Sequence, residues 1–126
     1  MIIDSSAWIE YFMGTEAGTR VRRWVDGKEM LYTSPIILAE VYSKSVRVDG
    51  ADRAQERVDF ILDRCALIPL DAEIGQKAGE IHVEGKQKNK DFGLADAFAL
   101  ASANTRGLRV LTQDKHILMY PEGVKI

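Results

Sequence analysis

Five short apolar or β-branched runs, each bounded by turn residues, are the strongest constraint on the fold of this chain. They read MIID, EMLYTS, ALIPL, RVLTQD and GVKI, and helical patterns lie between most of them. Strands that alternate with helices in this way favour an α/β fold with a mainly parallel sheet. Because 126 residues is the usual length of one domain, we expect a single domain over residues 1–126.

The signals at the helix ends divide the remaining sequence. The expected helices are SSAWIEYFM, EAGTRVRRWVDG, PIILAEVYSKSVR, residues 51–64, residues 71–87 and a last one from FGLADAFALASA to near residue 107. Gly14 separates the first two, Ser34 and Asp71 are good N-caps, and Pro35 suits a first helical position. The segment GKQKNKD is expected to be a lysine-rich turn.

Composition excludes several classes of protein. Seventeen Lys and Arg against nineteen Asp and Glu give a net charge of -2, without the basic excess of a protein that coats nucleic acid. No run approaches the roughly 20 apolar residues of a membrane span, so we expect no membrane contact. The single cysteine, Cys65, cannot form an intramolecular disulfide and is interpreted as a reduced core thiol. Together with the lack of an export signal, this favours a cytoplasmic protein.

A charged residue, Asp96, interrupts the apolar segment FGLADAFALASA. The residues three and four positions away from it are Phe92, Gly93, Ala99 and Leu100. In a helix none of them satisfies a carboxylate, and a lone buried carboxylate costs several kcal/mol unless it is paired, protonated or bound to a cation. The sequence therefore predicts that another part of the chain helps to stabilise this charge, by pairing with it or by binding a cation beside it.

Four acids lie at unusual positions, namely Asp4, Glu40, Asp96 and Asp114. Asp4 and Asp114 each follow a predicted strand, and ligands of open parallel sheets bind beyond the carboxyl ends of the strands. Carboxylates brought within about 4 to 6 Å repel by on the order of 1 to 4 kcal/mol per pair, which a divalent cation relieves. Oxygen ligands select a hard cation, so we expect Mg²⁺ or Mn²⁺.

Simpler interpretations of these residues remain open. Asp4 or Asp114 could each only cap the following helix, and Glu40 could pair with Lys44 four residues on. Ser6 is either a local cap or a hydroxyl that orients Asp4 or a metal-bound water.

The chain resembles the PIN domain family, and specifically the small ribonucleases that act as toxins of VapBC toxin-antitoxin pairs. The segments MIIDSSAWIEYF, SPIILAEVY, GLADAFALASA and VLTQDKHI are similar to the family's acid-bearing segments and occur in the family order. The resemblance implies a three-layer sandwich with a parallel five-stranded sheet, ordered 3-2-1-4-5 and flanked by helices. It also implies an endoribonuclease that cuts RNA with Mg²⁺ or Mn²⁺.

The resemblance assigns an acidic site to the chain. Its expected members are Asp4, Glu40, Asp96 and Asp114, with Ser6 and Thr112 in support. We expect the three aspartates to lie closest to the first metal ion, and the glutamate to act through water or as a base. Neither His82 nor His116 matches a catalytic position of the family, and both are interpreted as surface histidines.

An acidic site needs cations at its rim to attract RNA. Lys86, Lys88 and Lys90 are candidates for this role, as are three arginines at positions 20, 22 and 23. For both groups a solvated surface is an equally good interpretation.

The resemblance also implies two protein partners, a VapB-type antitoxin and a second copy of the chain. A groove for the antitoxin tail would be lined by Trp8, Tyr11, Phe12 and Trp24. A homodimer would form through the helices between residues 35 and 64, although the same apolar side chains could instead belong to the core. Those side chains are Val41, Tyr42, Val46, Phe60 and Ile61.

Other functions remain as alternatives. A receiver domain or a haloacid-dehalogenase-type phosphatase also places an Asp after its first strand, but the phosphatase pattern wants a second Asp where this chain has Ser6, and Lys125 fits the receiver pattern poorly. Within the PIN fold, the alternatives are a nuclease in RNA processing outside a toxin-antitoxin pair and a non-catalytic scaffold. Retention of all four acids argues against the scaffold.

Overall fold

A computed structural model describes residues 1–126 as a five-stranded sheet with seven helices. The strands are β1 (Ile2–Ile3), β2 (Tyr32–Thr33), β3 (Ala66–Leu67), β4 (Val110–Thr112) and β5 (Gly123–Lys125). The helices are α1 (Ser5–Met13), α2 (Glu16–Val25), α3 (Pro35–Asp49), α4 (Ala51–Arg64), α5 (Ala72–Lys88), α6 (Leu94–Arg106) and α7 (Lys115–Leu118). All neighbouring strands are parallel in the order β3-β2-β1-β4-β5, which confirms the predicted fold class and strand order.

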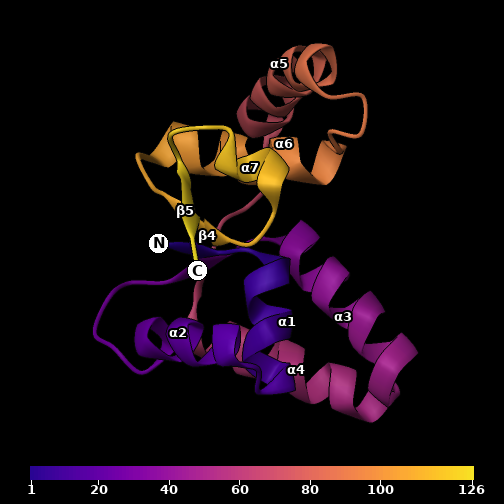
Figure 1. The fold of residues 1–126 in the computed structure, drawn as a ribbon, viewed down its shortest axis with the longest axis vertical. Helices are drawn as coiled ribbons and strands as arrows, with labels where there is room; N and C mark the ends of the chain where they lie inside the picture. Colours follow the sequence, from indigo (N-terminus) through magenta and orange to yellow (C-terminus); the bar gives the residue numbers. More distant parts are fainter.

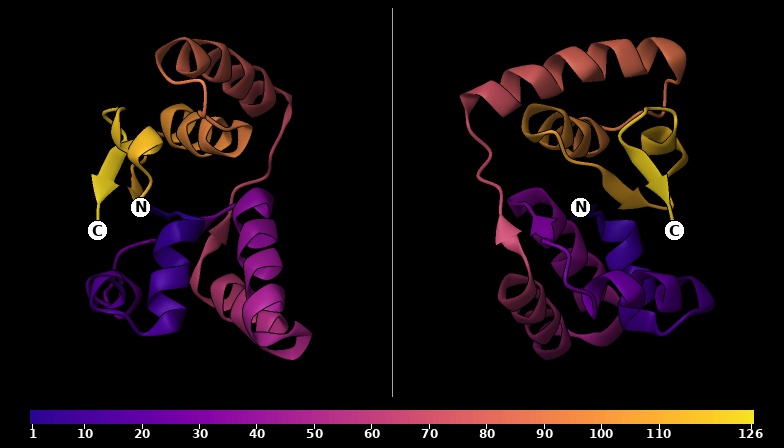
Figure 2. Two further views of the ribbon diagram at one scale, coloured as in Figure 1. Left: turned by 45° about the vertical axis from the view of Figure 1, so that its right-hand side comes forward. Right: turned by 90° about the vertical axis from the view of Figure 1, so that its left-hand side faces the viewer.

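The helices form two layers around the sheet (Figure 1). Helices α1 to α4 lie on one side and α5 to α7 on the other, as the rotated views also show (Figure 2). Both chain ends lie close to the sheet, because β1 begins the chain and β5 ends it.

Most of the predicted helix ends are confirmed. The Ser34 hydroxyl accepts from the Ile37 amide at 3.4 Å, and the Asp71 carboxylate accepts from the Ile74 amide at 3.0 Å. Gly14 has a φ of 68° and ends α1, because a left-handed backbone at this position suits glycine alone. Local capping chemistry thus sets these boundaries as the sequence indicated.

Several helix boundaries differ from the prediction, and one helix is additional. Helix α6 begins at Leu94, because Phe92 leaves the helical path to bury its ring against Gly85, where an added Cβ would lie 2.4 Å from the ring. Helix α5 continues through Lys88, so that only the end of GKQKNKD forms the turn. Helix α7 was not predicted, because four residues are too few to show helical periodicity.

The core contains 23 buried residues, drawn from the sheet and from both helix layers. Cys65 belongs to it, as expected, and burial raises the pKa of its thiol to about 11. No helix is both long enough and apolar enough to cross a membrane.

The core also takes up side chains that the sequence assigned to interfaces. Trp8 is fully buried, because the rings of Tyr11, Phe12 and Phe60 surround it with centroids 5.6 to 6.2 Å away. It therefore cannot line a surface groove, and that part of the antitoxin prediction is wrong. Of the predicted dimer residues, Val41 and Ile61 are core, whereas Tyr42, Val46 and Phe60 are exposed.

The pairing of β1 with β4 brings distant parts of the sequence together. Ile3 lies opposite Leu111, and the Asp4 amide donates to the Leu111 carbonyl at 3.0 Å. The two strands therefore end side by side and level with each other, so that their following residues meet at one edge of the sheet.

Candidate active site

A cavity of about 640 Å³ opens at this edge of the sheet. All four predicted acids line it, namely Asp4, Glu40, Asp96 and Asp114. They come from the end of β1, from α3, from the first turn of α6 and from the loop after β4. The structure thus gathers acids separated by up to 110 positions along the chain, as the pairing of β1 with β4 predicted.

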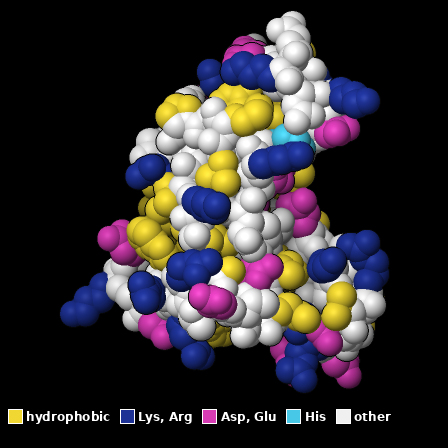
Figure 3. Space-filling view, in the orientation of Figure 1, with side chains coloured by type: hydrophobic (Ala, Val, Ile, Leu, Met, Phe, Trp, Pro, Cys, Tyr) yellow, Lys and Arg dark blue, Asp and Glu magenta, His cyan; other side chains and the backbone are white.

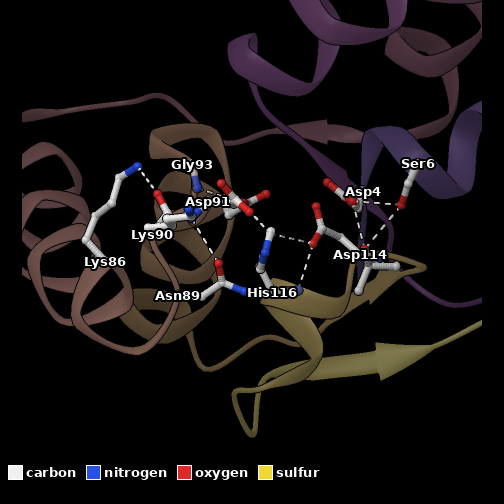
Figure 4. A network of polar contacts seen from close by, with 11 residues as sticks. Asp4, Ser6, Lys86, Asn89, Lys90, Asp91, Gly93, Asp114 and His116 are labelled. Carbon is white, nitrogen blue, oxygen red and sulfur yellow. Dashed lines mark hydrogen bonds and ion pairs between the residues drawn. The ribbon is translucent and has the colours of Figure 1, made fainter.

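Asp4 lies at the bottom of the site and is buried, with 6% of its surface exposed. Its Oδ2 atom accepts from the Ser6 hydroxyl at 2.9 Å and from the Thr112 hydroxyl at 2.8 Å (Figure 4). Burial raises the pKa of this carboxyl, and both hydroxyl bonds oppose that rise. The two hydroxyls therefore stabilise the charged form in the orientation seen.

Ser6 and Thr112 are themselves held by the loop after β4. The Gln113 amide donates to the Ser6 hydroxyl at 3.1 Å, and the Asp114 amide donates to the Thr112 hydroxyl at 2.9 Å. Each hydroxyl accepts an amide at a lone pair and keeps its one proton for donation to Asp4, although the two hydroxyls also lie 3.2 Å apart. The supporting role expected of Ser6 and Thr112 thus has a structural basis.

Asp96 lies in the first turn of α6 rather than in the middle of a helix. Its Oδ2 atom accepts from the Gly93 amide at 3.0 Å, so that it caps the helix that it enters. The sequence interpretation missed this partner because it began the helix two residues too early. Burial raises the pKa of this carboxyl to about 6, and the nearby charge of Asp114 adds to the rise.

Asp114 combines a capping bond with a place in the cavity wall. Its Oδ1 atom accepts from the His116 amide at 2.8 Å, which starts α7. The capping interpretation thus fits this residue, whereas Asp4 makes no side-chain cap bond to α1. Capping uses one oxygen of Asp114 and leaves the other for a further ligand.

Glu40 stands on the α3 wall of the cavity and is exposed over much of its surface. Its Oε1 atom accepts from the Ser5 hydroxyl at 3.1 Å, and no ion pair joins it to Lys44. Burial of the carboxyl within the cavity raises its pKa, and the charge of Asp4 adds to this effect.

His116 is a member of the site that the sequence interpretation missed. Its Nδ1 atom lies 3.4 Å from Asp114 Oδ1 and 3.6 Å from Asp96 Oδ2, and only 12% of its side chain is exposed (Figure 4). The interpretation as a surface histidine is therefore wrong. The available signal was its place two residues after Asp114, since a helix capped by Asp114 turns this side chain back toward the cap.

The second histidine, His82, lies outside the cavity. It is partly buried on α5, with its ring centroid 6.4 Å from that of Phe92.

A cation could be held by the atoms that meet here. Asp96, Asp114 and His116 each offer one ligand atom within 4.8 Å of the others. The histidine is the weakest of these candidates, because its Nε2 atom is buried without a partner. A metal bond at Nδ1 would place the proton on that orphaned atom, which costs about 1 to 3 kcal/mol. Carboxylate oxygens are therefore the better candidates to hold a divalent cation at this site.

The cations expected at the rim lie elsewhere. Lys86 donates to the Lys90 carbonyl at 2.6 Å, and Lys88 pairs with Glu84 at 3.1 Å. None of these lysines lines the cavity, nor do the arginines at positions 20, 22 and 23 of α2. The cations that do line it are Lys44 and Arg47 of α3.

The fold and the four acids in one cavity agree with a comparison against protein families. The PIN domain family matches residues 1–122. The chain belongs to the PIN domain family. No curated protein sequence matches this PIN domain.

Several solved structures share the fold of this PIN domain. VapC20 of Mycobacterium tuberculosis, a sarcin-ricin loop cleaving toxin, is 19% identical, with a TM-score of 0.78 over 94% of this chain and 92% of that one. VapBC2 of Rickettsia felis, bound to a DNA fragment from its promoter, is 17% identical, with a TM-score of 0.76 over 99% and 96%. DNA-bound VapBC of Salmonella typhimurium is 20% identical, with a TM-score of 0.76 over 99% and 95%.

Proposed function

We propose that this PIN domain is a Mg²⁺- or Mn²⁺-dependent endoribonuclease that hydrolyses RNA phosphodiester bonds. The observation that carries the proposal is the set of four carboxylates around one cavity, with no Lys or Arg paired to any of them. Neighbouring carboxylates contribute to the raised pKa values of Asp4, Glu40 and Asp96. Such mutual repulsion is relieved when a divalent cation binds.

The residues divide the work according to their surroundings. Asp4, Asp96 and Asp114 are the proposed metal ligands, and each has a hydrogen-bond donor that fixes one of its oxygens. When bound, the cation supplies a water of lowered pKa and neutralises charge on the phosphate oxygens. Glu40, at the more open wall, is placed to orient the attacking water or to accept its proton.

The nuclease proposal is tested with Asp96→Asn. The amide oxygen of Asn still accepts from the Gly93 amide, so that the fold is retained while one ligand charge is lost. We expect metal-dependent cleavage of RNA to disappear. Asp91→Asn is the matched control, because Asp91 is an exposed acid close in sequence that does not line the cavity. Cleavage at the wild-type rate by the Asp96 variant would contradict the proposal.

We further infer that the chain is the toxin of a VapBC-type pair. The solved structures that share its fold include VapBC complexes, the FitAB complex bound to DNA and a toxin-antitoxin complex from Klebsiella pneumoniae. Tyr11 and Phe12 form an aromatic pair that is not fully buried, and such a surface suits the apolar side of an antitoxin tail. Coexpression with the product of an adjacent small gene should give a stable complex in which cleavage is blocked.

A homodimer is proposed through the exposed side chains of α3 and α4. Tyr42, Val46 and Phe60 are each more than a third exposed, although large and apolar or aromatic. Light scattering should report a dimer at micromolar concentration, and a Val46→Glu variant should be a monomer. A wild-type chain that stays monomeric would contradict this assignment.

A further inference from the structure

The cavity extends well beyond the acids, along one face of α3. The α3 residues that line it are Ile36, Ala39, Glu40, Ser43, Lys44 and Arg47. They recur at intervals of three and four positions, so that about three successive turns of the same helix face border the space. The cavity is therefore a trench with Asp4, Asp96 and Asp114 toward the start of α3 and cations toward its end.

The sign of the charge changes along this trench. Lys44 and Arg47 follow Glu40 by four and seven positions, which places them about 6 and 10 Å farther along the helix axis. The space-filling view shows Asp and Glu side chains in the recess below the α6–α7 layer, and Lys or Arg side chains beside it over α3 (Figure 3). An anionic strand that reaches the acids therefore also passes a cationic wall.

Neither cation is engaged by an acid of the protein. Lys44 makes no ion pair or hydrogen bond, although Glu40 lies four residues before it, and the Glu40 carboxylate accepts from the Ser5 hydroxyl instead. Arg47 donates from Nε to the Ser43 carbonyl of its own helix at 3.2 Å, and this bond fixes the base of the guanidinium. The remaining donors of both side chains stay available to a ligand.

The other walls of the trench show what kind of contact is made there. The α1 wall adds Glu10, which accepts a hydrogen bond from the Thr15 hydroxyl and is not paired with either cation. The apolar lining residues are Ile9, Ile36, Ala39 and Ala95, and no aromatic side chain lines the cavity. Without an aromatic side chain, the cavity cannot bind bases by stacking. Binding of an RNA at this end therefore depends on its sugar-phosphate backbone. Phosphates are the groups that Lys and Arg contact without regard to sequence.

We propose that Lys44 and Arg47 form a phosphate-binding subsite that holds the RNA strand next to the cleaved bond. The inference rests on the proposed ribonuclease activity and deepens it. Its function is to hold a flanking phosphate of single-stranded RNA, which offsets the repulsion between the strand and the four carboxylates. The subsite positions substrate without touching the bond that breaks.

The test compares the double variant Lys44→Gln, Arg47→Gln with the wild type. Cleavage of a mixed-sequence single-stranded RNA dodecamer should show a KM raised about tenfold with kcat almost unchanged, as expected when binding common to ground and transition state is lost. Binding of the same labelled dodecamer is measured with Mg²⁺ in an Asp96→Asn background by fluorescence anisotropy. Over roughly 50 to 200 mM KCl, the slope of log K against log salt should become shallower by about 0.7, as expected for the loss of one phosphate contact.

Two further variants control for net charge and for folding. Lys86→Gln with Lys90→Gln removes the same charge outside the cavity, and it should leave KM and the salt slope near wild type. Lys44→Arg with Arg47→Lys keeps both charges and should restore binding. Both mutated positions on α3 are exposed, so that the melting temperature should not change.

The outcomes separate the subsite from the ribonuclease activity. If the wild type cleaves RNA and the double variant has the same KM and salt slope, the subsite is wrong and the proposed activity stands. A larger effect of the Lys86, Lys90 pair would also overturn the subsite. Loss of affinity for an acidic peptide with unchanged RNA binding would assign this wall to a protein partner instead.

Discussion

The Nδ1 atom of His116 lies 3.4 Å from Oδ1 of Asp114, while the Nε2 atom of the same ring is buried without a partner. A buried N–H without an acceptor costs more than a bare lone pair, so we expect a neutral ring to carry its proton on Nδ1, facing the carboxylates. From this position we expect His116 to act as a donor that orients Asp114 and Asp96, rather than as a metal ligand. Metal sites commonly use such outer hydrogen bonds to orient their carboxylates.

Two substitutions of His116 distinguish these roles. Asn places its amide nitrogen where Nδ1 stands, whereas Gln places it near Nε2. We expect His116→Asn to retain much of the metal-dependent cleavage, and His116→Gln to lose about tenfold or more in kcat/KM, in line with lost outer-sphere partners. The metal concentration at half-maximal rate should rise in the Gln variant. Equal losses in both variants would indicate that the ring only fills space beside Phe92.

The second prediction concerns the stability of the metal-free protein against pH. The pKa of Asp96 is raised to about 6 in the fold from a usual value of 3.8. The native state therefore binds its proton more tightly than the unfolded state does, so that this stabilisation is complete below pH 3.8 and is lost as pH rises through about 6. At pH 7 and in a chelator, Asp96→Asn should raise the free energy of unfolding by on the order of 1 to 3 kcal/mol.

The pH dependence itself provides the check on this prediction. Urea unfolding between pH 7 and pH 5 should show the wild type gaining stability as the pH falls, with a flatter curve for the Asp96 variant. Asp91→Asn, which changes an exposed acid, should follow the wild type. If Asp96→Asn lowers the free energy of unfolding at pH 7, other groups of the protein stabilise the charged Asp96 carboxylate, and the prediction is wrong.

Much of this architecture could be predicted because its signals are local. Ser34 followed by Pro35 and Asp71 before a long helical pattern mark helix starts through bonds to residues three positions away. The four acids could be grouped because two of them follow strands, and the carboxyl ends of parallel strands lie at one edge.

The predictions that were wrong concern features set by tertiary packing rather than by local sequence. The start of α6 moved because Phe92 buries itself against Gly85, which no local pattern reveals. His116 entered the site through α7, a helix too short to show a period. Which lysines border the cavity depends on which helix face turns toward it, so that Lys44 was considered only as a partner for Glu40.

The third prediction tests the hydroxyl support of Asp4. Thr112→Val removes one donor to the Asp4 carboxylate and leaves the Asp114 amide without its acceptor. The pKa of Asp4, already raised by burial, should rise further, so that the acidic limb of the cleavage profile moves to higher pH. Stability should fall by about 1 to 3 kcal/mol, the cost of leaving buried polar groups unpaired.

Thr112→Ser keeps the hydroxyl while it removes only the methyl group. It should restore the position of the acidic limb, with a small loss of stability from packing. If Thr112→Val and the wild type share one pH profile, the hydroxyl does not act through Asp4.

The last prediction concerns the cation and follows from the charge of the cavity. Burial raises the pKa values of Asp4, Glu40 and Asp96, and the charges of neighbouring carboxylates add to the rise, so that the charged forms destabilise the fold. Millimolar Mg²⁺ or Mn²⁺ should therefore raise the melting temperature, with a gain of about 1.4 kcal/mol at roughly tenfold excess over Kd. Mn²⁺ should act at lower concentration than Mg²⁺, because it stands higher in the affinity order and gives up water more readily. Ca²⁺ should bind without supporting cleavage, since its larger and looser shell holds the attacking water poorly.

The double variant Asp4→Asn, Asp114→Asn should lose the metal-dependent shift, whereas Asp91→Asn should keep it. An equal shift in the double variant and the wild type would place the cation elsewhere, because the double variant removes two of the five carboxylates that line the cavity.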